Sequence, residues 1–139
     1  MTVDQPLYRV ELAIPGRPEF VGVARLSLAR VASLKEFSFD AVEDIRLAVG
    51  EACTRAIDRL THFGMADKMV RVTCLAYSDR ISIEVSSPLT PAGEMPVAAP
   101  TSEDDLGSML VQILMDDLSE QEDPATGTHT LRMAKYLVR

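Results

Sequence analysis

Hydrophobic and polar residues near the start of the chain follow first a two-residue period and then a helical one. Leu7 to Ile14 alternate and include Tyr, Val and Ile, which predicts a strand that ends before Pro15. From Glu19 to about Glu36 the apolar residues recur at three- and four-residue steps, which predicts a helix that is apolar on more than one side. Such a helix contacts either a second subunit or more of its own core, and both alternatives stay open.

A second helix is predicted to begin at Asp40, a good N-cap residue with Glu43 three positions later. We expect it to end near Gly64. The apolar residues between these points are spaced by three or four, as one buried helical stripe requires. They are Val42, Ile45, Val49, Ala52, Ala56 and Leu60.

Two runs rich in β-formers, Met69 to Tyr77 and Arg80 to Ser86, are separated only by Ser78 and Asp79. A two-residue connection predicts an antiparallel hairpin. The next segment, Ser87 to Ser102, holds four of the eight prolines and has no apolar period, which predicts a long surface loop.

A third helix is predicted from Asp104 and Asp105 to Leu118, and a last strand from Thr128 to Val138. This order of elements predicts an α+β fold, a two-layer sandwich. Its sheet is expected to be mixed, mostly antiparallel, with three main helices on one face. The length of 139 residues fits one domain spanning 1–139.

Composition and charge narrow the classes of function. Apolar residues make up 47% of the chain, which indicates a folded protein rather than a disordered one. The net charge of -7 opposes direct nucleic-acid binding. No apolar run is long enough to cross a membrane and no export signal is evident, so we expect a cytoplasmic protein. Cys53 and Cys74 lack the spacing of a metal or redox motif, and His62 and His129 fit solvated or structural roles better than catalysis.

Four segments in order along the chain resemble the general-stress anti-sigma factor serine kinases of the GHKL (histidine-kinase-like) ATPase superfamily. The segments are Ile14 to Leu28, Phe39 to Thr54, Leu106 to Asp117 and Gly127 to Thr130. The resemblance implies a protein that sequesters a sigma factor and phosphorylates a serine on a small STAS-type anti-anti-sigma factor. It also implies ATP and Mg²⁺ as cofactors, and a homodimer.

The resemblance assigns Glu51 as the general base and places Arg55 where the family has a Mg²⁺-ligating asparagine. A guanidinium has no acceptor and carries a permanent positive charge, so it cannot ligate a divalent cation. No metal ligand is therefore predicted. Glu51 and Arg55 also lie one turn apart with the acid first, so an ordinary helix-surface ion pair is an alternative explanation.

The remaining nucleotide motifs of the family match Ser87, Gly107, Gly127 and Thr128. Ser87 stands where an aspartate accepts from adenine, and Leu89 stands where a glycine makes room for the nucleotide. The phosphate loop keeps only Gly107. Its neighbours Glu103, Asp104 and Asp105 would repel phosphate and fit better as groups at the helix N-terminus.

Three of the four family motifs for nucleotide binding are altered in ways that disfavour the binding of Mg-ATP. The sequence therefore predicts an anti-sigma factor-like binding protein with lost or weakened ATP binding. The alternative is an active serine protein kinase, in which Arg55 contacts a phosphate directly. A dimerising scaffold without a sigma factor partner is a third possibility.

Overall fold

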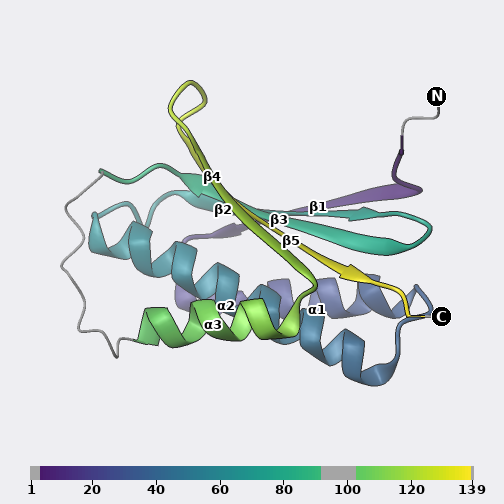
Figure 1. Cartoon of the computed structure of the whole chain (residues 1–139). Coiled ribbons are helices and arrows are strands. Elements are labelled where there is room, and N and C mark those ends of the chain that lie inside the picture. Colours follow the sequence, from purple (N-terminus) through teal and green to yellow (C-terminus); the bar gives the residue numbers. More distant parts are fainter. Residues whose placement is uncertain (1–3, 92–102, 139) are drawn as a thin grey trace.

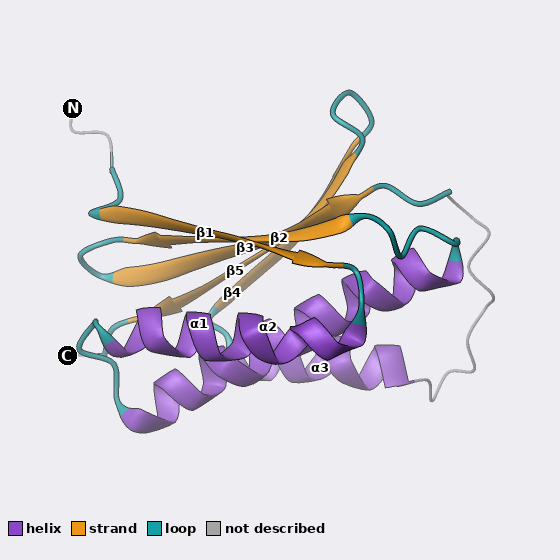
Figure 2. Ribbon diagram, turned by 180° about the vertical axis from the view of Figure 1, so that it is seen from behind, coloured by secondary structure: helices purple, strands orange, loops and turns teal. Residues whose placement is uncertain are grey.

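The computed structural model describes residues 4–91 and 103–138, which form a sheet covered on one face by three helices (Figures 1 and 2). The β-strands are β1 (Tyr8–Pro15), β2 (Met69–Ala76), β3 (Arg80–Pro88), β4 (Asp117–Asp123) and β5 (Thr128–Tyr136). The helices are η1 (Pro18–Phe20, a 3-10 turn), α1 (Val21–Ser33), α2 (Phe39–His62) and α3 (Glu103–Leu114).

The strands form one sheet in the order β1-β2-β3-β5-β4, and each pair of neighbours is antiparallel. The predicted α+β two-layer class, with three helices on one face, is confirmed. The predicted mixed sheet needs a correction, because the five described strands contain no parallel pair. The turns between β2 and β3 and between β4 and β5 reverse the chain direction, as do α1 and α2, which together bring the chain from the end of β1 back to the start of β2 at the same end of the sheet. The connection through α3 instead returns the chain to the opposite end, so that β4 runs in the same direction as β3 with β5 between them.

The core lies between the sheet and α2. Alternate residues of β2 and β3 face the helices, and the predicted stripe of α2 is buried from Ile45 to Leu60. Val42, the first member of that stripe, is only partly buried. The hairpin closes as predicted, with the N–H of Tyr77 donating to the carbonyl of Arg80 at 2.8 Å.

The N-cap of α2 is Ser38 rather than the predicted Asp40. The Ser38 hydroxyl oxygen accepts from the N–H of Ala41 at 3.1 Å, and Ser38 has the extended backbone typical of a cap. Asp40 therefore lies inside the first turn, where its negative charge still interacts favourably with the helix dipole.

The helix predicted from Glu19 to Glu36 is shorter, because η1 precedes α1 and α1 ends at Ser33. Its apolar residues do face two directions, as the pattern predicts. Ala24 and Leu28 are buried against the rest of the protein, while Val23 is 45% and Leu26 is 70% exposed.

The segment after α3 differs most from the prediction. The third helix ends at Leu114, four residues before the predicted Leu118, and β4 follows at Asp117. Nearly all of β4 is polar and exposed, so it shows no apolar alternation by which the sequence could reveal a strand. It forms because it pairs with β5, in a register that places Leu118 opposite Met133.

Strand β3 extends two residues beyond the predicted Ser86, since Ser87 pairs with His129 and Pro88 with Thr128. The predicted surface loop therefore begins after Pro88, and most of it, 92–102, lies outside the described residues. No helix in the described part of the chain has both the length and the hydropathy of a membrane span.

Candidate functional site

Glu51 and Arg55 lie one turn apart on α2, on the side that packs against α3. Both are partly buried. The contact residue on α3 is Gly107, which is itself buried: a Cβ built on Gly107 would lie 2.6 Å from Oε2 of Glu51 and 3.9 Å from Cδ of Arg55. Glycine at this position therefore allows α3 to approach the Glu51 carboxylate closely.

The ion pair considered as an alternative role for Glu51 and Arg55 is not formed. In the described structure, no Arg55 nitrogen lies within the 4 Å of a Glu51 oxygen that a salt bridge requires. The carboxylate instead faces the backbone of α3 at Gly107. The aliphatic part of Arg55 borders the same contact.

Ser87 occupies a different part of the site, at the end of β3, where its side chain points toward the helices and is 4% exposed. Its hydroxyl oxygen lies 3.5 Å from Nη2 of Arg59, one turn beyond Arg55 on α2. The same Nη2 lies 2.9 Å from Nδ1 of His129 on β5. Nε2 of that ring lies 3.0 Å from Oε1 of Glu120 on β4.

These four residues form a continuous polar chain across three strands and α2. Because a guanidinium only donates, Nδ1 of His129 accepts, and its Nε2–H is left to donate to Glu120. Burial and the Arg59 charge lower the pKa of His129, while Glu120 acts in the opposite direction. The neutral ring that results bridges a cation and an anion.

Gly127 and Thr128 lie at the turn between β4 and β5, where Gly127 has φ of 66°. They share with Ser87 a pocket of about 290 Å³. The carbonyl of Gly127 accepts from the N–H of Leu89 at 2.9 Å, which ties this turn to the end of β3. Leu89, which the resemblance matches to a family glycine, thus continues the pairing of β3 beyond Pro88.

The six sequence-predicted residues therefore meet in two groups. Glu51, Arg55 and Gly107 meet where α2 contacts α3, and Ser87, Gly127 and Thr128 meet where β3 and β5 adjoin. Glu103, Asp104 and Asp105, predicted to repel phosphate, lie in the first turn of α3, and nothing is described of their side chains.

Sequence reasoning missed Arg59 and Glu120 and treated His129 as incidental. One feature of the sequence indicates that Arg59 belongs to the site: it follows Arg55 by four residues and so lies on the same face of the helix. No sequence pattern indicates this for Glu120, because it reaches His129 only through the pairing of β4 with β5. Together with Gln121 and Glu122, these three residues line a second pocket of about 340 Å³.

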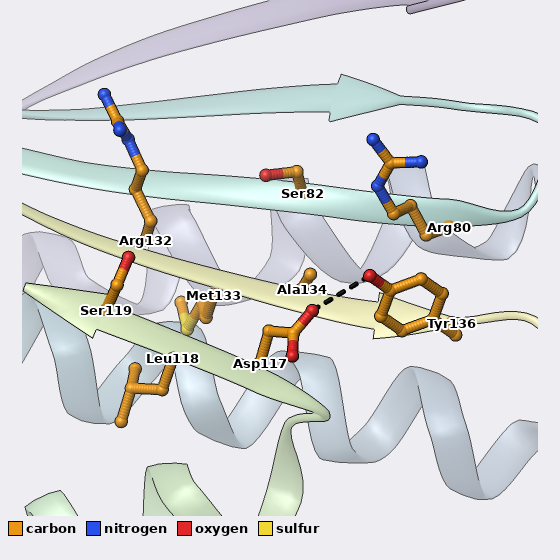
Figure 3. Close-up of a pocket in the computed structure, with 9 residues that line it drawn as sticks. All are labelled: Arg80, Ser82, Asp117, Leu118, Ser119, Arg132, Met133, Ala134 and Tyr136. Atoms are coloured by element: carbon orange, nitrogen blue, oxygen red, sulfur yellow. Dashed lines mark hydrogen bonds between the residues drawn. The ribbon is translucent and has the colours of Figure 1, made fainter. Parts of the chain in front are cut away.

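A larger cavity, of about 410 Å³, contains none of the predicted residues (Figure 3). It lies over β3, β5 and β4, and the O–H of Tyr136 donates to Asp117 at its edge, at 2.9 Å. Its two cations already have acidic partners: Arg80 pairs with Asp4 and Asp79, and Arg132 pairs with Glu84. We therefore assign the candidate site to the six predicted residues together with Arg59, His129 and Glu120.

In the part of the chain that the structure describes, no group of three or more His, Cys, Asp or Glu side chains could hold a metal ion. Cys53 and Cys74 are buried free thiols, and burial raises the pKa of each to about 12. Neither is therefore a nucleophile at neutral pH.

Residues 14–135 match the family model described as a histidine kinase-like ATPase domain. The chain is 34% identical to serine-protein kinase RsbW of Bacillus licheniformis, over 94% of this chain and 86% of that protein. It is 32% identical to serine-protein kinase RsbW of Bacillus subtilis strain 168, over 92% of this chain and 85% of that protein.

The fold is also similar to a crystal structure of the RsbU and RsbW domains of a Mycobacterium tuberculosis protein. The TM-score is 0.70 at 13% identity, and the match covers 96% of this chain and 34% of that chain.

Proposed function

The chain belongs to the histidine kinase-like ATPase family that includes the serine-protein kinases RsbW, and from this premise we propose that it sequesters a sigma factor in a partner-switching pathway. A STAS-type anti-anti-sigma factor is the proposed antagonist. In this proposal the protein acts in the cytoplasm as a homodimer, and its ATP binding is lost or weakened.

The contact of Arg59 with Ser87 and His129 carries the proposal of weakened ATP binding. Ser87 takes the place of the family's adenine-accepting aspartate, and the Arg59 guanidinium lies 3.5 Å from its hydroxyl oxygen. A purine bonding to Ser87 would have to displace this guanidinium and leave His129 without its donor.

The residues at the place of the family's metal site also do not fit Mg²⁺. Arg55 has no acceptor oxygen to offer a cation, and its positive charge repels one. The packing of Gly107 against the Glu51 carboxylate further limits access to the family's general base. We therefore assign no reaction step to ATP.

The surface proposed for the sigma factor is the outer side of α1. Leu26 is 70% exposed and Val23 is 45% exposed, and large apolar side chains gathered on one surface are typical of protein interaction sites. The net charge of -7 favours encounter with a basic region of the partner. The Pro-rich loop, the other surface that the sequence suggests, lies largely outside the described residues.

Calorimetric titration of the purified chain with ATP and Mg²⁺ tests the nucleotide part of the proposal. We expect no binding heat up to millimolar nucleotide. Micromolar, magnesium-dependent binding would contradict it. Arg59→Ala is the informative variant, since any gain of adenosine binding on removing the guanidinium would identify Arg59 as the obstructing group.

Affinity purification from the native host, followed by mass spectrometry, tests the partner. We expect a sigma factor to co-purify with the unmodified chain and to be lost with Leu26→Glu. The matched control is Ile113→Glu, because Ile113 is 75% exposed but lies on α3. Absence of any sigma factor with the unmodified chain would exclude the sequestration role.

The alternative function is an active serine protein kinase that phosphorylates the STAS-type antagonist. One observation favours it: Glu51 is retained and has no ion-pair partner within the described residues. Transfer of labelled phosphate to the antagonist, abolished by Glu51→Gln, would establish this alternative.

A further inference from the structure

The pocket that contains Gly127 and Thr128 is lined by charged side chains that have no role in the predicted nucleotide site. Its two charged lining residues are Lys68 and Arg71, and none of the described carboxylates lines it. The other lining residues are Met69, Ser86, Ser87, Pro88, Thr126, Gly127 and Thr128. Two cations with no acid are unusual in a chain whose net charge is -7.

This pocket opens on the face of the sheet opposite the helices. Side chains alternate along a strand, and Val70 and Val72 are buried toward the helices, so Arg71 between them points to the open face. By the same alternation Ser86 points outward while Ser87 points inward to Arg59. The turn between β4 and β5 points away from the helices (Figure 1).

Lys68 and Arg71 form no ion pair within 4 Å among the described residues. The pKa of Glu11 is lowered mainly by Arg9 and to a smaller extent by Arg71. Glu11 is already bound by Arg9, at 2.7 Å. The charge of Arg71 is therefore available to a ligand.

The backbone around the pocket is held in place on two sides. The N–H of Gly16 donates to the carbonyl of Lys68 at 2.9 Å, and a Cβ on Gly16 would lie 2.8 Å from that same oxygen. On the other side, Gly127 accepts from Leu89. The start of β2 and the β4–β5 turn are thus both tied to their neighbouring segments.

We propose that this pocket, formed by Lys68, Arg71 and the Thr126–Thr128 turn, binds a phosphate monoester dianion. An arginine fork beside a lysine point charge is a common arrangement for such a group. The volume of about 290 Å³ lies at the lower end of ligand-site volumes, which suits a small phosphorylated compound. The hydroxyl groups of Ser86, Thr126 and Thr128 each already have one hydrogen-bond partner, so the two cations supply the selectivity.

Amide NMR spectra of the full chain test the proposal, with titrations of inorganic phosphate, O-phosphoserine and acetate at constant ionic strength. We expect phosphate and O-phosphoserine to shift the amides of residues 68–71 and 126–128, and acetate to bind more weakly. Tighter binding of O-phosphoserine than of inorganic phosphate would support an ester as the ligand, and equal or tighter binding of inorganic phosphate would overturn the assignment to a monoester. Stronger binding of acetate would overturn the assignment.

The variant Lys68→Gln with Arg71→Gln should weaken phosphate binding by roughly tenfold or more. Both side chains are exposed, so the variant should fold. The control is Arg30→Gln with Arg46→Gln, which removes the same charge from the helices. Equal affinity in the two double variants, or no shifts at the named amides, would refute the site. Arg55 and Arg59 are unchanged in both, so the outcome is independent of the proposed function.

Discussion

Gly107 of α3 lies so close to Glu51 of α2 that a methyl group on Gly107 would come within 2.6 Å of the carboxylate. The contact joins α2, which carries the predicted general base Glu51, to α3, whose first turns hold the residues of the predicted phosphate loop. It therefore couples the position of α3 to the conformation of one acidic side chain.

Gly107→Ala should stabilise the protein more when Glu51 is alanine than when it is glutamate. Alanine is favoured over glycine in a helix by about 1 kcal/mol, but in the unmodified protein the Glu51 side chain must rotate to make room. Urea unfolding of the two single variants and the double variant should give a coupling energy of at least about 0.5 kcal/mol. Gly22→Ala on α1 is the control, because its Cβ would meet no atom within 4 Å; additivity at Gly107 would refute the contact.

Ser38→Ala should lower the free energy of unfolding by about 1 kcal/mol, because Ser38 caps the first turn of α2. Asp40→Asn, at the N-cap predicted from sequence, should cost less, about 0.3–0.5 kcal/mol, since it removes only a favourable charge near the helix dipole. Denaturant midpoints compare the two variants directly. A larger loss of unfolding free energy in Asp40→Asn than in Ser38→Ala would indicate that Asp40 is the N-cap, as the sequence predicts.

The stability of the protein should decrease as pH falls below the ordinary His pKa of 6.5. Burial and Arg59 lower the pKa of His129 in the folded state, so the unfolded chain binds the proton more readily. The stabilisation is complete above pH 6.5 and is lost as pH falls through the folded-state pKa. Arg59 from α2 and Glu120 and Glu122 from β4 are the charged groups that act on this ring.

Unfolding free energies at pH 7.5 and 5.5 measure this effect. His129→Gln should reduce the pH dependence, and His62→Gln, at an exposed position, is the control. The same pH dependence in all three proteins would exclude His129 as its source.

Cys53 and Cys74 should resist alkylation by iodoacetamide in the native protein at pH 8. Burial raises the pKa of each thiol to about 12, so almost none is present as the reactive thiolate, and both are inaccessible. Mass spectrometry should find two modified cysteines only after denaturation. Rapid native labelling of either residue would show that the core opens locally near it.

Lys135→Met should lower the free energy of unfolding by about 1–3 kcal/mol. Its Nζ donates to the carbonyl of Leu114 at the end of α3, at 2.7 Å, and lies 3.2 Å from Asp44 on α2. The variant keeps the apolar stem but leaves both acceptors without this donor. Lys68→Met, at an exposed position, is the control, and equal effects of the two would show that Lys135 does not tie the helices to β5.

The long helix and the β2–β3 hairpin were predictable because their signals are local. The buried stripe of α2 recurs every three or four residues, and Ser78 with Asp79 marks a tight connection. Strand β4 was not predictable, since an exposed polar edge strand has no apolar period and exists only because β5 pairs with it. The N-cap was misplaced by two residues because Ser and Asp are nearly equivalent caps, and only the backbone at Ser38 distinguishes them.

The amino-acid sequence alone determined the α+β class and the buried faces of the main elements. Each of these depends on residue type and short-range spacing. The tertiary structure decided that Arg59 meets Ser87 and His129, although 70 residues separate Arg59 from His129. It also decided that Glu51 faces Gly107 rather than Arg55. Such contacts depend on which elements pack together, and long-range packing leaves no periodic signal in the chain.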